Sequence, residues 1–235
     1  MFTSQSTTQK PQTENNAVSF GTKKDAGTGA ARKATIVAQG NAFLQELCKL
    51  IFTLNWFRSS KKPFSEQVPV KAGTVLFHMN KDGNLGLNCK VYQAFEESMF
   101  VDGGFSLKED CGVLTSRAVY KRGKNPNATQ NADGQPAARE KAVVISTSND
   151  EATCSLLKDL VISVLHYQDG NDRPEEIAII TPYISKGALR ISGKLVKAIP
   201  ETWYDESGFQ LRPEHGRITT SIKYKKSASD RFQQA

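Results

Sequence analysis

Aromatic residues lie next to basic residues at several points of the sequence, and of all its patterns this pairing indicates a chemical role most directly. Arg117 and Tyr120 precede a run of Lys and Arg, and Tyr224 lies between two lysines. Flat rings can stack on unpaired bases while nearby cations follow the phosphates, so the pattern favours binding of single-stranded nucleic acid. The competing interpretation places rings such as Trp203 in the core, and for Tyr120, Trp203 and Tyr224 the two interpretations are equally strong.

We expect thirteen residues to contact nucleic acid. They are the cations and rings that lie closest together in the sequence: Lys61, Lys62, Arg117, Tyr120, Lys121, Arg122, Lys124, Trp203, Arg217, Lys223, Tyr224, Lys225 and Lys226. The segment 210–225 alternates an apolar face with a basic, hydroxylic face formed by Arg217, Thr219, Ser221 and Lys223.

Motifs of known enzymes are missing from the sequence. The nearest match to a phosphate-binding P-loop begins at Gly187, but five residues separate it from Gly193, where four are required, and Leu195 replaces the hydroxyl residue. The three histidines have no second His or Cys at ligand spacing: His78, His166 and His215. Paired carboxylates occur, but adjacent pairs in loops usually face solvent. We therefore expect no catalytic residue, no metal and no cofactor.

Positive charge is concentrated in three polar segments. Residues 1–37 carry five Lys or Arg against two Asp or Glu, residues 121–141 five against two, and residues 211–235 six against two, a sum of +10. The remainder sums to −3, because the whole chain is +7. Basic arms on a near-neutral body suit a polyanion, since Lys and Arg release counterions from phosphates. Solvated tails that maintain solubility are the alternative.

The composition predicts an intracellular protein without a membrane span. The longest apolar stretch, 43–57, is interrupted by polar residues, and the N-terminus has no apolar stretch behind a basic start. Four widely spaced cysteines stand beside apolar residues, which predicts buried reduced thiols: Cys48, Cys89, Cys111 and Cys154. We expect the protein in the cytoplasm of the producing or host cell.

Hydrophobic periodicity predicts two amphipathic helices. Apolar residues recur at three- and four-residue spacing from Asn41, a suitable N-cap, to about Ser59. A second apolar stripe runs to about Tyr167, and it follows Ser148 and Glu151, which have the spacing of a capping box.

Short β-prone runs separated by turn signals predict an antiparallel sheet. The expected strands are 34–38, 67–79, 85–94, 113–120, 141–147, 177–181, 188–198 and 210–225. Residues 121–140 contain no aliphatic residue larger than Ala and are expected to form a long mobile loop. No internal repeat is evident.

These features predict an α+β fold: a strand-rich antiparallel body, for which an OB-like barrel is one candidate, with two amphipathic helices, a disordered N-terminal arm and a basic C-terminal tail. The expected divisions are a disordered basic arm (1–34), a single α+β domain (35–225) with a mobile loop at 121–140, and the basic tail (226–235). Two halves divided by that loop would each be small, which favours one domain.

The expected function is sequence-tolerant binding of single-stranded DNA in replication or recombination, without enzymatic activity, as in phage or plasmid proteins. The alternative is a structural subunit of a virion or filament whose basic arm reaches toward a genome. The expected partner is single-stranded nucleic acid, DNA or RNA, and not a membrane. A second copy of the chain, and an acidic protein that contacts the C-terminal tail, are further candidate partners.

Overall fold

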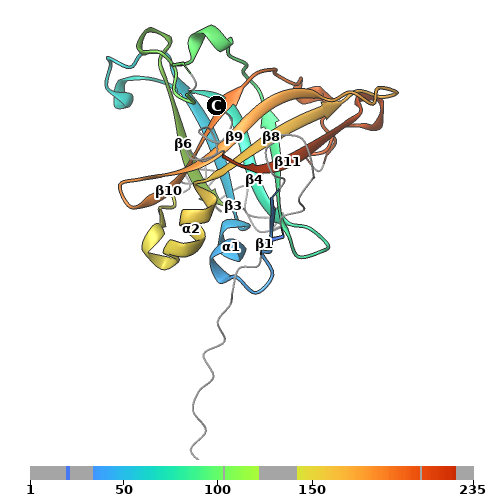
Figure 1. Ribbon diagram of the computed structural model, residues 1–235. Coiled ribbons are helices and arrows are strands. Elements are labelled where there is room, and N and C mark those ends of the chain that lie inside the picture. Colours follow the sequence, from blue (N-terminus) through green and yellow to red (C-terminus); the bar gives the residue numbers. More distant parts are fainter. Residues whose placement is uncertain (1–19, 22–33, 103, 122–141, 207, 226–235) are drawn as a thin grey trace, which may run out of the picture.

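The computed structural model describes residues 20–21, 34–102, 104–121, 142–206 and 208–225, which form a strand-rich fold with antiparallel sheets and two α-helices (Figure 1). This is the class of fold that the sequence predicted. Nearly all of the expected arm, the expected loop at 121–140 apart from its first residue, and the C-terminal tail lie outside the described residues. So do three predicted site residues: Arg122, Lys124 and Lys226.

The first half of the described chain is a short helix followed by a four-stranded antiparallel sheet in the order β5-β4-β3-β6. The elements are α1 (Ala42–Leu47), β3 (Leu50–Phe57), β4 (Val70–Met79), β5 (Leu85–Val91) and β6 (Val113–Tyr120). Two-residue strands β1 (Phe20–Gly21) and β2 (Thr35–Ile36) pair with each other.

The second half has the same order of elements, and its main strands are arranged β11-β8-β9-β10. The elements are α2 (Glu151–Leu157), β8 (Leu160–Tyr167), β9 (Glu175–Ser185), β10 (Ala188–Leu195) and β11 (Arg217–Tyr224), with the short strand β7 (Ile145–Ser146) beside β10. Short 3-10 helices lie in the connections: η1 (Phe64–Glu66), η2 (Glu97–Met99), η3 (Glu109–Cys111), η4 (Thr147–Asn149), η5 (Glu201–Trp203) and η6 (Pro213–His215).

Both predicted helices are too long, because each apolar stripe combines a short helix with a buried strand. α1 ends at Leu47, and Leu50, Phe52 and Leu54 of β3 then face the core at the two-residue spacing of a strand. Similarly, α2 ends at Leu157, and the apolar residues that follow it in the predicted helix belong to β8. Aliphatic residues at alternate strand positions, placed after a helix of about two turns, imitate helical periodicity.

The strand predictions succeed to different degrees. The range 113–120 coincides with β6, whereas β9 is longer than predicted and β11 begins at Arg217 rather than near 210. The range 141–147 contains only the two residues of β7 in its described part. Glycine and proline signals located the turns, but the 3-10 helices before β6 and β11 occupy sequence that had no distinctive pattern.

The two halves are copies of one structural unit, which corrects the expectation that the chain has no repeat. We call 34–121 repeat 1 and 143–225 repeat 2. Their hairpins shift register at equivalent places, between Leu54 and Asn55 in β3 and between Val164 and Leu165 in β8. Residues 85–121 and 189–225 align without a gap, and eleven of the 37 aligned pairs are identical. A shared bulge is a specific feature, so the duplication extends to local geometry.

The repeats enclose one hydrophobic core and exchange equivalent hydrogen bonds. The N–H of Phe95 donates to the carbonyl of Leu195, and the N–H of Ile199 donates to the carbonyl of Val91, each at 2.8–2.9 Å. Two copies related by an approximate two-fold axis are expected to form such a reciprocal pair of hydrogen bonds. The strands of one sheet run across those of the other, and both helices lie at the same end of the molecule (Figure 1).

Two equivalent segments join the edges of the sheets. Ala34 N–H donates to the Ile222 carbonyl of β11, and Val143 N–H donates to the Ala118 carbonyl of β6, both at 2.8 Å. Val143 leads into β7, which pairs with β10, so this segment contacts a strand of each sheet. An OB fold is a five-stranded barrel, whereas here a four-stranded sheet and a five-stranded sheet, which includes the short strand β7, are joined by short segments, and the OB-like form is not confirmed.

The cysteines are free thiols in two environments. Cys89 and Cys154 are buried, as predicted, whereas Cys48 and Cys111 are half-buried. Burial raises the pKa of Cys89 to about 12, which keeps this thiol protonated and unreactive at neutral pH.

The N-termini of the two helices meet across the repeats. Asn41 caps α1 by accepting from Leu44 N–H at 2.9 Å, and its side-chain amide donates to the Thr153 hydroxyl of α2 at 3.0 Å. Asp150 caps α2 by accepting from Thr153 N–H at 2.9 Å. The predicted cap at Ser148 is therefore wrong. Burial raises the pKa of Asp150, but the hydrogen bonds from Thr153 and Asn41 outweigh burial and leave the pKa below its ordinary value.

We expect Asp150→Ala to lower the free energy of unfolding by about 1 kcal/mol at pH 7, because Thr153 N–H loses its acceptor. A lowered carboxyl pKa stabilises the folded state above the ordinary pKa of about 3.9, and this contribution is lost as the pH falls through the folded-state value. Urea unfolding should therefore show a smaller difference at pH 3. Ser148→Ala is the control, and an equal loss in that variant would contradict the cap.

Candidate nucleic-acid interface

Each sheet directs alternate residues away from the core, and we call these surfaces outer face 1, on repeat 1, and outer face 2, on repeat 2. Strand register assigns fifteen positions to each. Outer face 1 consists of Ile51, Thr53, Asn55, Phe57, Lys71, Thr74, Leu76, His78, Gly86, Asn88, Lys90, Val113, Thr115, Arg117 and Val119. Outer face 2 consists of Val161, Ser163, Leu165, Tyr167, Glu176, Ile179, Thr181, Tyr183, Arg190, Ser192, Lys194, Arg217, Thr219, Ser221 and Lys223.

The outer faces are basic and hydroxylic, and they are poor in carboxylates. Seven of the thirty positions are Lys or Arg, and Glu176 is the one carboxylate among them. The whole chain has 31 Lys or Arg against 24 Asp or Glu, so the excess of positive charge on these faces is larger than the composition provides. Such a surface attracts phosphate groups and provides hydroxyl donors to their oxygens.

Two of these cations serve the contact between the repeats. The Lys90 amine lies 4.4 Å from the ring centroid of Tyr204, which belongs to repeat 2. At the equivalent position, the Lys194 amine pairs with Glu97 and lies 5.2 Å from the ring centroid of Phe100, both in repeat 1. Both lysines are buried. Their charges are therefore engaged within the fold, and the remaining five cations are the candidates for phosphate.

The predicted residues Arg217 and Lys223 lie on outer face 2, as the alternation of the last strand indicated. The Arg217 guanidinium carbon lies 4.8 Å from the ring centroid of Tyr167, its cross-strand neighbour. This pairs an exposed cation of the edge strand β11 with a half-buried ring of β8, an arrangement suited to a phosphate and a base. Arg117, a third predicted residue, is exposed on outer face 1.

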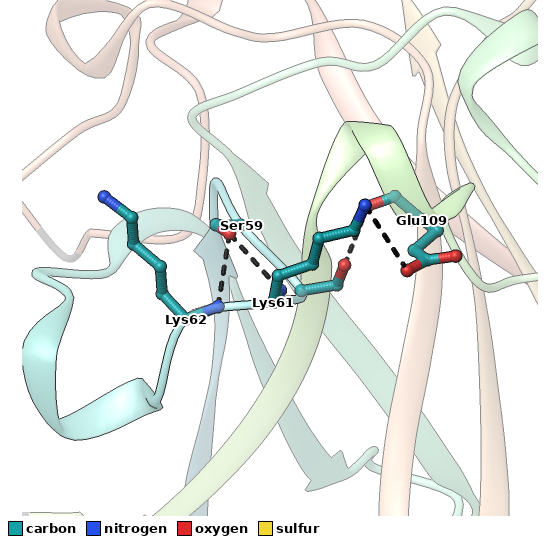
Figure 2. Close-up of polar contacts among 5 residues, drawn as sticks. Ser59, Lys61, Lys62 and Glu109 are labelled. Atoms are coloured by element: carbon teal, nitrogen blue, oxygen red, sulfur yellow. Dashed lines mark hydrogen bonds and ion pairs between the residues drawn. The ribbon is translucent and has the colours of Figure 1, made fainter.

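Lys61 and Lys62 lie in the loop between β3 and β4. The Ser59 hydroxyl accepts from both of their backbone N–H groups at 3.3 Å, which fixes the turn (Figure 2). The Lys61 amine lies 4.0 Å from a carboxylate oxygen of Glu109, whereas the Lys62 side chain points away from it (Figure 2). Both side chains are exposed, so the pair is an accessible cationic loop.

Lys121 and Lys225 occupy equivalent positions and hold the ends of the helices. Lys121 donates to the Cys48 carbonyl after α1, and Lys225 donates to the Lys158 carbonyl after α2. Desolvation lowers the pKa of both amines. Sequence reasoning assigned them to phosphate alone and missed this structural role.

The three predicted rings differ in exposure. The Trp203 ring stacks on His215 with 4.5 Å between centroids and 11° between planes, and it packs against the core. Tyr224 also packs against the core, where burial raises its pKa. Tyr120 is 55% exposed at the end of β6. The core interpretation therefore describes Trp203 and Tyr224, and Tyr120 alone is an exposed ring.

Sequence reasoning missed several residues of the outer faces. Tyr167, Tyr183 and Asn55 are half-buried outward residues on strands, yet Tyr167 and Asn55 fell inside the predicted helices. Alternation within 50–57 and 160–167 was the signal that could have found them.

A pocket of about 370 Å³ opens where outer face 2 meets repeat 1. The rings of Phe105 and Tyr183 line it, together with the hydroxyls of Thr181 and Ser192 and with Lys225. Ser192 donates to the Phe105 carbonyl at 3.2 Å, which fixes the loop of repeat 1 against β10. Residues of both repeats are thus needed to form this pocket.

Within the described ranges, no group of three or more His, Cys, Asp or Glu residues is arranged to hold a metal ion. Nor does the described part of the chain contain a helix that is long and apolar enough to cross a membrane. Comparison of the chain with protein-family models, with curated proteins and with solved structures gives no match.

Proposed function

We propose that this protein binds single-stranded DNA without sequence preference and without catalysing a reaction, through its two outer faces. The observation that carries the proposal is the composition of these faces: among thirty outward positions there is one carboxylate, and five cations remain when the buried Lys90 and Lys194 are set aside. Phosphate contacts of this kind carry no sequence information, so the binding is expected to tolerate any sequence.

Half-buried rings on the outward side of the sheet supply the second part of the interaction. Tyr167 lies beneath Arg217, and Tyr183 is the cross-strand neighbour of Arg190, so each ring is paired with a cation on outer face 2. Stacking of a base on such a ring contributes about 1–3 kcal/mol, and the neighbouring cation can contact the adjacent phosphate. The proposal needs an open sheet face and does not need an OB-type barrel.

The test compares two triple variants that remove the same charge. Arg117→Ala/Arg217→Ala/Lys223→Ala removes the predicted cations of the outer faces, and Lys49→Ala/Lys81→Ala/Lys186→Ala removes three exposed lysines elsewhere. With a labelled dT oligonucleotide, anisotropy titrations at several salt concentrations should show at least about tenfold weaker binding for the first variant. Its log–log salt slope should fall by about 2, because each lost contact contributes about 0.7.

The control variant should keep the affinity and slope of the unchanged protein. Equal losses in both variants would show that net charge alone drives binding and would contradict a role for the outer faces. An rU oligonucleotide in the same titration measures the preference between DNA and RNA. A virion or filament subunit would instead self-assemble in the absence of any oligonucleotide, which sizing of the free protein detects.

A further inference from the structure

The pocket between outer face 2 and repeat 1 has the chemistry of a nucleotide site. Its volume of about 370 Å³ is at the lower end of the range for small-molecule sites, which suits one nucleotide rather than a longer segment. Phe105 and Tyr183 provide flat apolar surfaces, and the Thr181 and Ser192 hydroxyls provide polar groups. No carboxylate is among the residues that line it.

The polar groups of the pocket have capacity left for a ligand. The Thr181 hydroxyl donates to the Leu160 carbonyl at 2.9 Å and also lies 3.3 Å from the Pro182 carbonyl, and the Ser192 hydroxyl donates to the Phe105 carbonyl at 3.2 Å. A hydroxyl that donates its hydrogen still has acceptor capacity on its oxygen. The Lys225 amine has three donors, one of which is used by the Lys158 carbonyl. The pocket can therefore accept hydrogen bonds from the N–H groups of a base and donate to a phosphate.

The pocket is continuous with the surface proposed to bind DNA. Tyr183, Thr181 and Ser192 belong both to outer face 2 and to the pocket. A strand that crosses outer face 2 thus passes the pocket entrance, and one unstacked base can enter while its neighbours stay on the open face. The rings of Phe105 and Tyr183 are the groups that a base would contact, and the Lys225 amine is the group that a phosphate would contact.

We infer that this pocket binds one nucleotide of the single strand, with its base against Phe105 and Tyr183 and its phosphate at Lys225. The inference rests on the proposed function and deepens it, because it assigns a specific subsite within a sequence-tolerant surface. It also gives the contact between the repeats a role, since the pocket exists only where both repeats meet.

Thymidine 5′-monophosphate (dTMP) and a dT oligonucleotide are the two probes, and both are titrated into the full-length protein. We expect the protein to bind dTMP more tightly than inorganic phosphate. Tyr183→Ala should weaken binding of dTMP and of the oligonucleotide by roughly five- to 150-fold, the range that corresponds to one stacked base. Ile184→Ala is the control, because Ile184 is the next residue of β9, is 40% exposed and points to the opposite side.

Crosslinking gives a measurement that does not depend on the stability of a variant. A dT oligonucleotide with 5-iododeoxyuridine at one position should crosslink on irradiation to Phe105 or Tyr183 in the unchanged protein, as mapped by mass spectrometry. Crosslinks confined to residues outside the pocket would overturn the inference.

The possible failures are distinguishable. If the oligonucleotide binds but dTMP does not, and Tyr183→Ala binds the oligonucleotide normally, the pocket is not a nucleotide site and the proposed function stands. Equal binding of dTMP and inorganic phosphate would show a phosphate site without base recognition, which also overturns the inference. If neither probe binds, both the inference and the proposed function fail.

Discussion

Gly216→Ala is expected to lower the free energy of unfolding by more than about 4 kcal/mol, a large part of the stability of a typical domain. Gly216 precedes β11 with φ 80° and ψ −145°, a conformation that costs other residues about 1–3 kcal/mol. A Cβ at this position would also lie well inside 3.0 Å of the Tyr167 carbonyl oxygen, and backbone atoms of a paired strand cannot move aside.

The same strain recurs in repeat 1, where a Cβ on Gly112 would collide with the Phe57 carbonyl oxygen. Gly170→Ala is the matched control. Gly170 also has a positive φ, of 70°, but a Cβ there would meet no atom within 4 Å, so the cost is limited to about 1–2 kcal/mol. Urea unfolding followed by circular dichroism measures Gly216→Ala, Gly170→Ala and the equivalent variant Gly112→Ala. A loss in Gly216→Ala no larger than in Gly170→Ala would contradict the close approach of the backbone.

Gly112 and Gly216 illustrate why the duplication was hard to recognise in the sequence: the repeats share backbone geometry more than they share side chains. The features that the repeats share are backbone features: two strained glycines, two bulges and reciprocal hydrogen bonds. Different side chains occupy equivalent positions, such as Trp56 and His166, each of which directs a ring nitrogen at the carbonyl of an equivalent residue. Eleven identities in 37 positions are too dispersed to form a visible motif.

The sequence predicted the class of fold because alternation and turn residues act locally. β6 and β11 lie within stretches where alternation is regular, and these strands were located correctly or nearly so. The helices were misjudged because the strands that follow them are buried, so that their apolar residues join the helical stripe. The crossing of the sheets depends on contacts between residues about 100 positions apart, for which no local signal exists.

The candidate site was predictable where one strand forms it and unpredictable where several elements meet. Arg217 and Lys223 were placed on one face by alternation alone, and the structure agrees. Trp203 was grouped with cations by proximity in sequence, whereas folding brings it against His215. The pocket combines Phe105 with Tyr183, which lie in different repeats, so that only the folded chain brings these rings together.

Trp203→Ala should therefore lower stability without weakening DNA binding by the folded protein. The ring is half-buried, stacks on His215 and packs against the core, so its removal leaves a cavity and should cost about 2–4 kcal/mol in the free energy of unfolding. Because His215 covers one face of the ring, a base would have to displace a stacked partner to use that face. We expect the affinity of the folded fraction for a dT oligonucleotide to change less than twofold.

Tyr167→Ala should show the opposite behaviour and serves as the comparison. Tyr167 is an outward residue paired with Arg217, and its loss should weaken oligonucleotide binding by about 1–3 kcal/mol with a smaller effect on stability than that of Trp203→Ala. Thermal unfolding and anisotropy titration, measured on the same preparations, separate the two effects. If Trp203→Ala weakens binding as strongly as Tyr167→Ala while the protein remains folded, the Trp203 ring contacts DNA directly and the binding surface extends from outer face 2 over η5.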